Sequence, residues 1–166
     1  MAYDDPNHNV FEIFKRNAVE YMVVGGFAVS YYGDYRKSKT ASGHELDKPD
    51  LDFWYNPSYE NYYRLLNALQ ELGRDVTRYR DDPAPSPKKS VFKYEFDDYT
   101  LDVLPIIKAS LKFWEAYTRR KVIEQNGIEI PFISLDDLIQ DKQAMGRQKD
   151  LADIENLKRN NPPQVS

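Results

Sequence analysis

The run Tyr21–Val24 is the feature that most constrains the fold, because consecutive β-prone apolar residues are typical of a buried strand. Gly25 and Gly26 end this run, and a tight turn is expected there because glycine adopts backbone conformations closed to other residues. The segment Phe27–Tyr32 then predicts a short helix that Gly33 ends. A buried strand is therefore expected to pass through a glycine turn into a helix.

Alternating helix and strand patterns continue to the C-terminus, so we expect a mixed α/β (α+β) fold in a single domain over residues 1–166. Asp97-Asp98 and Asn126-Gly127 each predict a hairpin turn. The expected strands are Leu51–Tyr55, Ser90–Phe96, Tyr99–Leu104, Lys121–Glu124 and Ile128–Phe132. The expected helices are Val10–Val19, Ser58–Gly73 with Ser58 as N-cap, Leu111–Tyr117, Ser134–Gly146 with a Ser134/Asp137 capping box, and Arg147–Lys158 with a buried stripe of Leu151, Ile154 and Leu157.

Composition excludes several classes of active site. The chain has no cysteine and only two histidines, His8 and His44, which argues against thiolate nucleophiles, cysteine-ligated metals and histidine-dependent triads. Any metal ion would therefore be held by carboxylates. The formal charge of -4 gives no global attraction to nucleic acid. The chain shows neither a signal peptide nor an apolar run of membrane-spanning length, so a cytoplasmic protein without membrane contact is expected.

The sharpest chemical pattern is Asp50-Leu51-Asp52-Phe53. Side chains alternate along a strand, so Asp50 and Asp52 share one face while Leu51 and Phe53 point into the core. Two carboxylates on one face repel each other unless a cation lies between them, and hard oxygen ligands favour Mg²⁺. The structural alternative is that both acids are solvated residues near a strand end.

Asp102 lies between Leu101 and Val103, so it is expected on the face opposite to these core residues. A strand that neighbours the Asp50–Asp52 strand would bring Asp102 beside that pair, giving three carboxylates around one or two divalent ions. Asp102 taken alone is equally compatible with an ordinary exposed strand residue.

Gly25 and Gly26 stand at a strand-to-helix junction, where backbone amides and a helix N-terminus are able to contact a phosphate. Ser30, one turn into the helix, is within reach of the same anion. The alternatives are a plain glycine turn and a serine that bonds its own backbone.

Cations near the start of the last helix form a further candidate site. Arg147 and Lys149 lie where the helix dipole disfavours positive charge, so a shared anion would explain them. Together with Lys142 they are predicted to contact a triphosphate or an acceptor phosphate. The alternative is ion pairing with Asp150 and Asp153.

The order of these motifs resembles the nucleotidyltransferase superfamily with a polymerase-beta-type palm. The family's apolar strand with Gly-Gly turn, its D-x-D strand and its third acid correspond to Val23–Gly26, Asp50–Asp52 and Leu101–Val103. Residues 133–154 are similar to the tail of small bacterial members such as the abortive-infection AbiEii-like group, in which a Lys and a Lys-Asp pair follow the palm. The resemblance spans about residues 21–157, the core of the expected domain, and departs from the family in a longer loop over 34–49.

The resemblance implies a magnesium-dependent enzyme that moves a nucleoside monophosphate from an NTP to a hydroxyl, on a mixed palm sheet flanked by helices with a two-helix tail. Asp50 and Asp52 would bind Mg²⁺, and Asp102 would ligate the acceptor-side ion and help deprotonate the hydroxyl. Arg36, which keeps the family's arginine position, and Asp150, in the Lys-Asp pair, are further implied nucleotide-site residues. The acceptor, the NTP and the oligomeric state stay open.

The same resemblance allows a tRNA or other RNA, a protein or a small molecule as acceptor, and a toxin-like role with an antitoxin partner protein. The main alternative is a non-catalytic NTP-binding or protein-interaction module on the same fold, favoured by the long loop before Asp50. A D-x-D glycosyltransferase is disfavoured because the chain is short for a doubly wound sheet.

Overall fold

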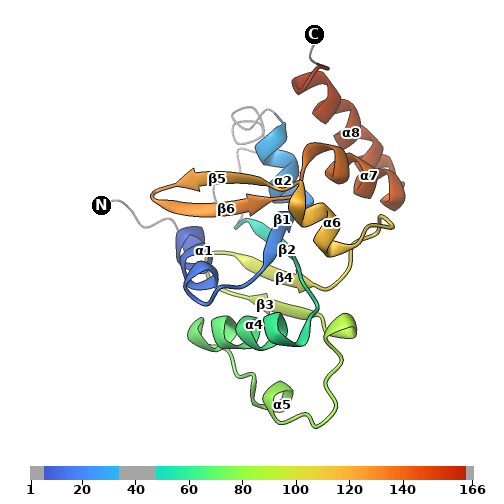
Figure 1. Cartoon of the computed structure of the whole chain (residues 1–166). Coiled ribbons are helices and arrows are strands. Elements are labelled where there is room, and N and C mark those ends of the chain that lie inside the picture. Colours follow the sequence, from blue (N-terminus) through green and yellow to red (C-terminus); the bar gives the residue numbers. More distant parts are fainter. Residues whose placement is uncertain (1–5, 34–47, 164–166) are drawn as a thin grey trace.

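A mixed sheet forms the centre of the structure (Figure 1), a computed structural model that describes residues 6–33 and 48–163. In that part of the chain the sheet has six strands in the order β3-β4-β2-β1-β6-β5. The strands are β1 (Tyr21–Val24), β2 (Asp50–Tyr55), β3 (Phe92–Glu95), β4 (Thr100–Leu104), β5 (Lys121–Gln125) and β6 (Ile128–Phe132). The helices are α1 (Pro6–Arg16), α2 (Gly25–Tyr32), α4 (Tyr59–Glu71), α5 (Thr77–Arg80), α6 (Phe113–Thr118), α7 (Leu135–Met145) and α8 (Gln148–Asn160), with a 3-10 turn at Pro87–Lys89.

The two faces of the sheet are used differently. On one face, Phe53 of β2 packs against Phe14 of α1 and Tyr21 of β1, with ring centroids 5.2 and 4.6 Å apart. The opposite face carries Asp52 and then Trp54, which stacks edge-on against Phe113 of α6. The expected mixed sheet with flanking helices and a C-terminal helix pair is therefore confirmed, and the acidic side of β2 faces away from the aromatic core.

Local signals in the sequence place several element boundaries correctly. The Ser58 side chain accepts a hydrogen bond from the Asn61 N–H, and Ser134 accepts one from the Asp137 N–H, as N-caps do. Asn126 and Gly127 both have positive φ, which matches the hairpin turn between β5 and β6. Gly146 ends α7 in the left-handed conformation.

Other boundaries differ from the expectation. The first helix ends at Arg16 rather than Val19, because Ala18 adopts a positive φ that turns the chain toward β1. The second helix begins at Gly25 rather than Phe27. Helix α5 occupies Thr77–Arg80, where no helix was predicted. The expected loop over 34–49 lies outside the described residues except for Lys48 and Pro49.

The buried stripe of α8 differs from the prediction at one position. Leu151 was expected in the core, but it is 52% exposed, whereas Ile154 and Leu157 are buried. Asp150 is fully buried instead, and it lies four residues before Ile154 and seven before Leu157. This spacing is one helical face, so Asp150 takes the place expected for Leu151.

None of the helices in the described ranges is both long and apolar enough to cross a bilayer.

Asn61 joins three elements through its buried side-chain amide. Its Oδ1 accepts a hydrogen bond from the Glu20 N–H at 2.7 Å, and its Nδ2 donates to the backbone carbonyls of Glu20 and Asn56 at 2.9 and 2.8 Å. These bonds tie α4 to the start of β1 and the end of β2.

Replacing Asn61 with alanine is expected to lower the free energy of unfolding by about 1–3 kcal/mol, because buried backbone groups lose their partners. Urea unfolding followed by circular dichroism measures this loss. Asn67→Ala is the matched control, since Asn67 lies on the same helix but is exposed, and it should stay within about 0.5 kcal/mol of the wild type. Equal losses of unfolding free energy in both variants would contradict a stabilising role for the Asn61 hydrogen bonds.

Candidate active site

A row of side chains crosses four strands on the acidic face of the sheet. Strands β2 and β4 are parallel and in register, so Asp52 and Asp102 are direct cross-strand partners. On either side of this pair the register places Lys93 of β3 opposite Asp102, and Val24 of β1 opposite Asp52. Because cross-strand partners share a face, the two carboxylates project side by side. Sequence pattern predicted their faces, and strand pairing brings them together.

Asp50 lies on the same face as Asp52 but one step removed from the pair. Its cross-strand partner is Thr100, whose hydroxyl donates a hydrogen bond to the Asp50 carboxylate at 2.5 Å. Within residues 6–33 and 48–163, no three histidine or acidic side chains are grouped so as to hold a metal ion. Strand register thus brings Asp52 and Asp102 side by side, and a metal site made of Asp50, Asp52 and Asp102 stays a prediction.

Gly25 makes room for the Asp52 carboxylate. It has φ +67°, and a Cβ atom placed on it would lie 2.2 Å from Asp52 Oδ2. Gly26 meets no such obstacle, since a Cβ there has open space around it. Ser30 lies half-buried further along α2. The requirement for glycine at position 25 thus comes from the close approach of Asp52 and from the left-handed backbone.

The environment of Asp52 disfavours its negative charge. Burial, followed by the nearby Asp102 and Asp50 carboxylates, raises the pKa of Asp52 to about 6. The charges of Lys142 and Lys93 act in the opposite direction. A divalent cation beside Asp52 and Asp102 would act against this shift, because a nearby positive charge favours the ionised carboxylate.

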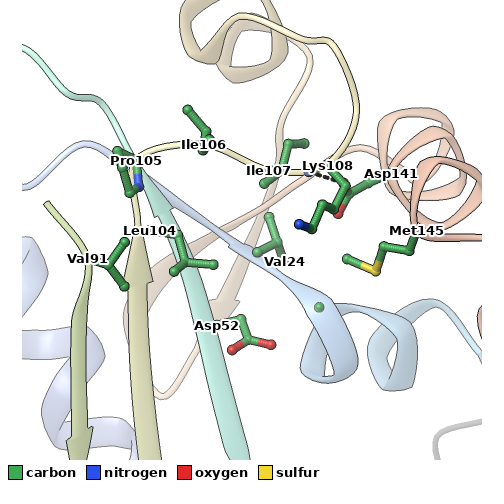
Figure 2. A pocket seen from close by; sticks show the side chains of 11 residues that line it. Val24, Asp52, Val91, Leu104, Pro105, Ile106, Ile107, Lys108, Asp141 and Met145 are labelled. Atoms are coloured by element: carbon green, nitrogen blue, oxygen red, sulfur yellow. Dashed lines mark hydrogen bonds between the residues drawn. The ribbon is translucent and has the colours of Figure 1, made fainter. Parts of the chain in front are cut away.

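Asp52 opens into a cavity of about 310 Å³. Figure 2 shows the Asp52 carboxylate below the chain segment that follows β4. Helix α7, which carries Asp141 and Met145, lies at the right of this view. The cavity is lined by Val24, Gly25, Asp52, Val91, Leu104, Pro105, Ile106, Ile107, Lys108, Asp141 and Met145. The end of β1, the acidic face of β2 and the end of β4 thus meet at one concave surface.

Asp141 of α7 fixes one wall of this cavity. Its buried carboxylate accepts hydrogen bonds from the backbone N–H groups of Lys108 and Ala109, at 2.8 and 2.9 Å. Burial raises the pKa of Asp141, whereas these two bonds and the charge of Lys142 lower it. The sequence analysis missed Asp141, because its partners are backbone groups more than 30 residues away and no local pattern signals them.

Lys93 is the second site residue that the sequence analysis missed. Its Nζ lies 4.0 Å from Asp102 Oδ2, although the side chain is largely exposed. Lys93 comes directly after the buried Phe92 in β3. From the sequence, this position indicates only that its side chain faces solvent. Only the register of β3 on β4 reveals that it flanks the carboxylate pair.

The predicted phosphate-binding cations have partners within the chain. Lys142 is 95% buried, and its Nζ lies 3.2 Å from both Asp150 Oδ1 and Asp153 Oδ2. Arg147 Nε donates to Asp150 Oδ2 at 2.6 Å. The Arg147 guanidinium, with help from Lys142, holds the pKa of Asp150 well below its usual range.

The anion that these cations share is therefore the Asp150 carboxylate, which also accepts the Arg147 N–H at the start of α8. The structure therefore contains the alternative to phosphate contact, which is ion pairing with Asp150 and Asp153. At Lys142 this ion pair is buried rather than on the surface. Lys149 is exposed on the first turn of α8. Arg36 lies outside the described residues.

Comparison with known proteins supports the fold. The chain matches no protein-family profile and no curated protein. It is similar in structure to the antibiotic-resistance factor ANT(2'')-Ia, a solution structure, with a TM-score of 0.52 and 16% sequence identity over 92% of this chain and 80% of that one. The fold is therefore similar to that of this resistance factor. At this identity the likeness concerns the fold alone, and it leaves the AbiEii-like subgroup as a prediction.

Gly25→Ala should displace the Asp52 carboxylate and cost about 1–2 kcal/mol of stability, because alanine disfavours the left-handed backbone. Thermal unfolding and Mn²⁺ binding measured by electron paramagnetic resonance are the two readouts, and both should decline. Gly26→Ala is the neighbouring control and should leave Mn²⁺ affinity unchanged, since the space there is open. Unchanged Mn²⁺ affinity in Gly25→Ala would show that the glycine is not needed to position the Asp52 carboxylate for cation binding.

The raised pKa of Asp52 predicts a specific pH dependence of stability. The folded protein holds this proton more tightly than the unfolded chain, so without divalent ions stability falls as the pH rises from about 4 to about 6. Asp52→Asn should remove this fall, giving a higher Tm than the wild type at neutral pH and a similar Tm near pH 4. Thermal scans in chelator across this pH range measure it, and parallel pH profiles for the two proteins would contradict it.

Proposed function

We propose that the protein is a magnesium-dependent nucleotidyltransferase that moves a nucleoside monophosphate from an NTP to a hydroxyl of an acceptor. The observation that carries this proposal is the registered pair of Asp52 and Asp102, of which Asp52 lines a cavity beside the Gly25 turn. The nucleotidyltransferase-like fold supports it independently. A single carboxylate on a strand would not support this proposal, because nucleotidyl transfer needs charge neutralisation at a triphosphate.

The residues present fit a divalent cation. Asp52 and Asp102 supply hard oxygen ligands from adjacent strands, and the pKa of Asp52 is raised in a way that a bound cation would reverse. Bound Mg²⁺ would supply charge neutralisation at the transferred phosphoryl group. Asp50 is one step away on the same face, and its Oδ1 accepts the Thr100 hydroxyl.

The transfer is a displacement at the α-phosphorus of the NTP. The acceptor oxygen forms a bond to this phosphorus as the bond to the β-phosphate oxygen breaks, and pyrophosphate leaves. Asp102, whose side chain is 36% exposed, accepts the proton of the acceptor hydroxyl. The N–H groups at Gly25 and Gly26 lie where α2 begins and would bind phosphate oxygens. Phosphate contact by the Ser30 hydroxyl, further along α2, stays a prediction from the sequence.

The buried ion network on α7 and α8 has a positioning role in this proposal. Lys142 is held between Asp150 and Asp153, and its charge lowers the pKa of Asp52. It therefore favours the ionised form of the carboxylate that a cation needs. Triphosphate contact by Lys149 or Arg36 stays a prediction from the sequence, as does a toxin-like role with an RNA acceptor or an antitoxin partner.

Non-catalytic NTP binding is the second candidate function. The specific observation in its favour is that Asp50, the expected third carboxylate, is engaged by Thr100 in the described part of the chain. Isothermal titration calorimetry with NTP and Mg²⁺ distinguishes the two candidates. Magnesium-dependent binding without release of pyrophosphate would favour the binding module.

Transfer from α-labelled NTPs to cellular RNA, protein and small-molecule fractions tests the enzyme directly. Asp52→Asn and Asp102→Asn should each reduce labelling by about 100-fold or more, because each removes several kcal/mol of charge stabilisation. Asp97→Asn is the matched control, an exposed acid in the turn between β3 and β4, and should label like the wild type. No labelling by any preparation, or equal labelling by Asp52→Asn, would refute the enzyme.

A further inference from the structure

The cavity beside Asp52 is mostly apolar, although it adjoins a cluster of charges. Leu104 lies two residues beyond Asp102 on β4, and Val91 lies two residues before Lys93, so both line the cavity. Ile106 and Val91 are 68% and 45% exposed, which is unusual for large apolar side chains. The surface next to the carboxylate pair therefore suits an uncharged group better than water.

The cavity lining has three charged residues, Asp52, Asp141 and Lys108. Asp141 accepts two backbone N–H groups through its Oδ1. A divalent cation would bind to Asp52, and Lys108 adds a positive charge at the exposed rim. With that cation bound, a ligand that carries several amines would meet two positive charges, aliphatic side chains and a single further carboxylate, Asp141.

We propose that this cavity binds the uncharged, apolar body of the acceptor, and that the acceptor is a neutral hydroxyl compound with an aromatic or aliphatic ring system rather than a polycation. This inference rests on the proposed transferase function. It names the acceptor class that the sequence left open.

The position of the cavity favours the acceptor as its occupant over the triphosphate or the base of the NTP. The triphosphate is excluded by its charge, because a lining of aliphatic side chains with two carboxylates and one lysine does not solvate it. The base of the nucleotide is separated from the α-phosphorus by the ribose, whereas the acceptor oxygen must bond to that phosphorus directly. Since the cavity begins at Asp52, a ring seated in it would present an attached hydroxyl to the reacting centre.

The wall that carries Ile106 and Ile107 is anchored rather than loose. Asp141 holds the segment after β4 through the N–H groups of Lys108 and Ala109 (Figure 2). The apolar rim is thereby held at a set distance from α7, where Met145 forms the facing side. Such anchoring is expected of a binding surface, because a preformed pocket saves the entropy of ordering it.

The test uses the full chain with methyl-labelled isoleucine and methionine, with Mg²⁺ and no NTP. Tryptophol and tryptamine are the probes, since they share one ring system and differ in a neutral hydroxyl against a charged amine. Tryptophol should shift the methyl signals of Ile106, Ile107 and Met145 saturably, with a Kd about tenfold lower than that of tryptamine. A tenfold ratio corresponds to about 1.4 kcal/mol.

A pair of variants tests the location. Ile106→Asp should weaken tryptophol binding about tenfold and improve binding of tryptamine. Leu151→Asp is the matched control, because Leu151 is also an exposed apolar residue but lies on α8 away from the cavity lining. It should leave both affinities unchanged. Both positions are exposed, so neither substitution is expected to unfold the chain.

The outcomes separate this inference from the proposed function. Tighter binding of tryptamine, or equal tryptophol affinity in Ile106→Asp and the wild type, would overturn the inference even if label transfer succeeds. An NTP that shifts the same methyl signals and is displaced by tryptophol would assign the cavity to the base and overturn it as well. Selective tryptophol binding in a chain that transfers no label would refute the transferase and leave a cavity for neutral rings.

Discussion

The in-register parallel pairing of β2 and β4 is the interaction on which the site depends. It sets Asp52 directly opposite Asp102, so that two like charges project from adjacent strands. Burial, and then the neighbouring carboxylates, raise the pKa of Asp52, so the ionised pair is unfavourable without a counterion. The sheet can carry the pair because its opposite face packs a large aromatic core around Phe53. Stability is thus concentrated on one face and chemistry on the other.

Features around the pair are arranged to accommodate it. Gly25 leaves space for the Asp52 carboxylate, and Asp141 anchors the wall that faces it. Behind them, Lys142 is buried between two carboxylates and contributes a positive charge felt at Asp52. The C-terminal helix pair therefore does more than cover the sheet. The charge of Lys142 on α7 also lowers the pKa of Asp52.

The sequence was informative wherever the signal is local. Serine caps at Ser58 and Ser134, the turn at Asn126-Gly127 and the alternation around Asp52 depend on a few neighbouring residues, and the structure contains them all. It failed where a distant partner decides. Leu151 has the character of a core residue, but the ion pairs of Asp150 draw a polar residue into the face that Leu151 was expected to fill.

By itself, the sequence determined which side chains share a face of each strand, where the helices capped by Ser58 and Ser134 begin, and that any metal ligands are expected to be carboxylates, because these follow from backbone periodicity, capping and composition. Only the tertiary structure decided that Asp52 meets Asp102 while Asp50 meets Thr100, since a strand's pattern is the same whichever neighbour it pairs with. The roles of Lys93 and Asp141 were also decided there. Both arise from contacts between elements, and such contacts have no period along the chain.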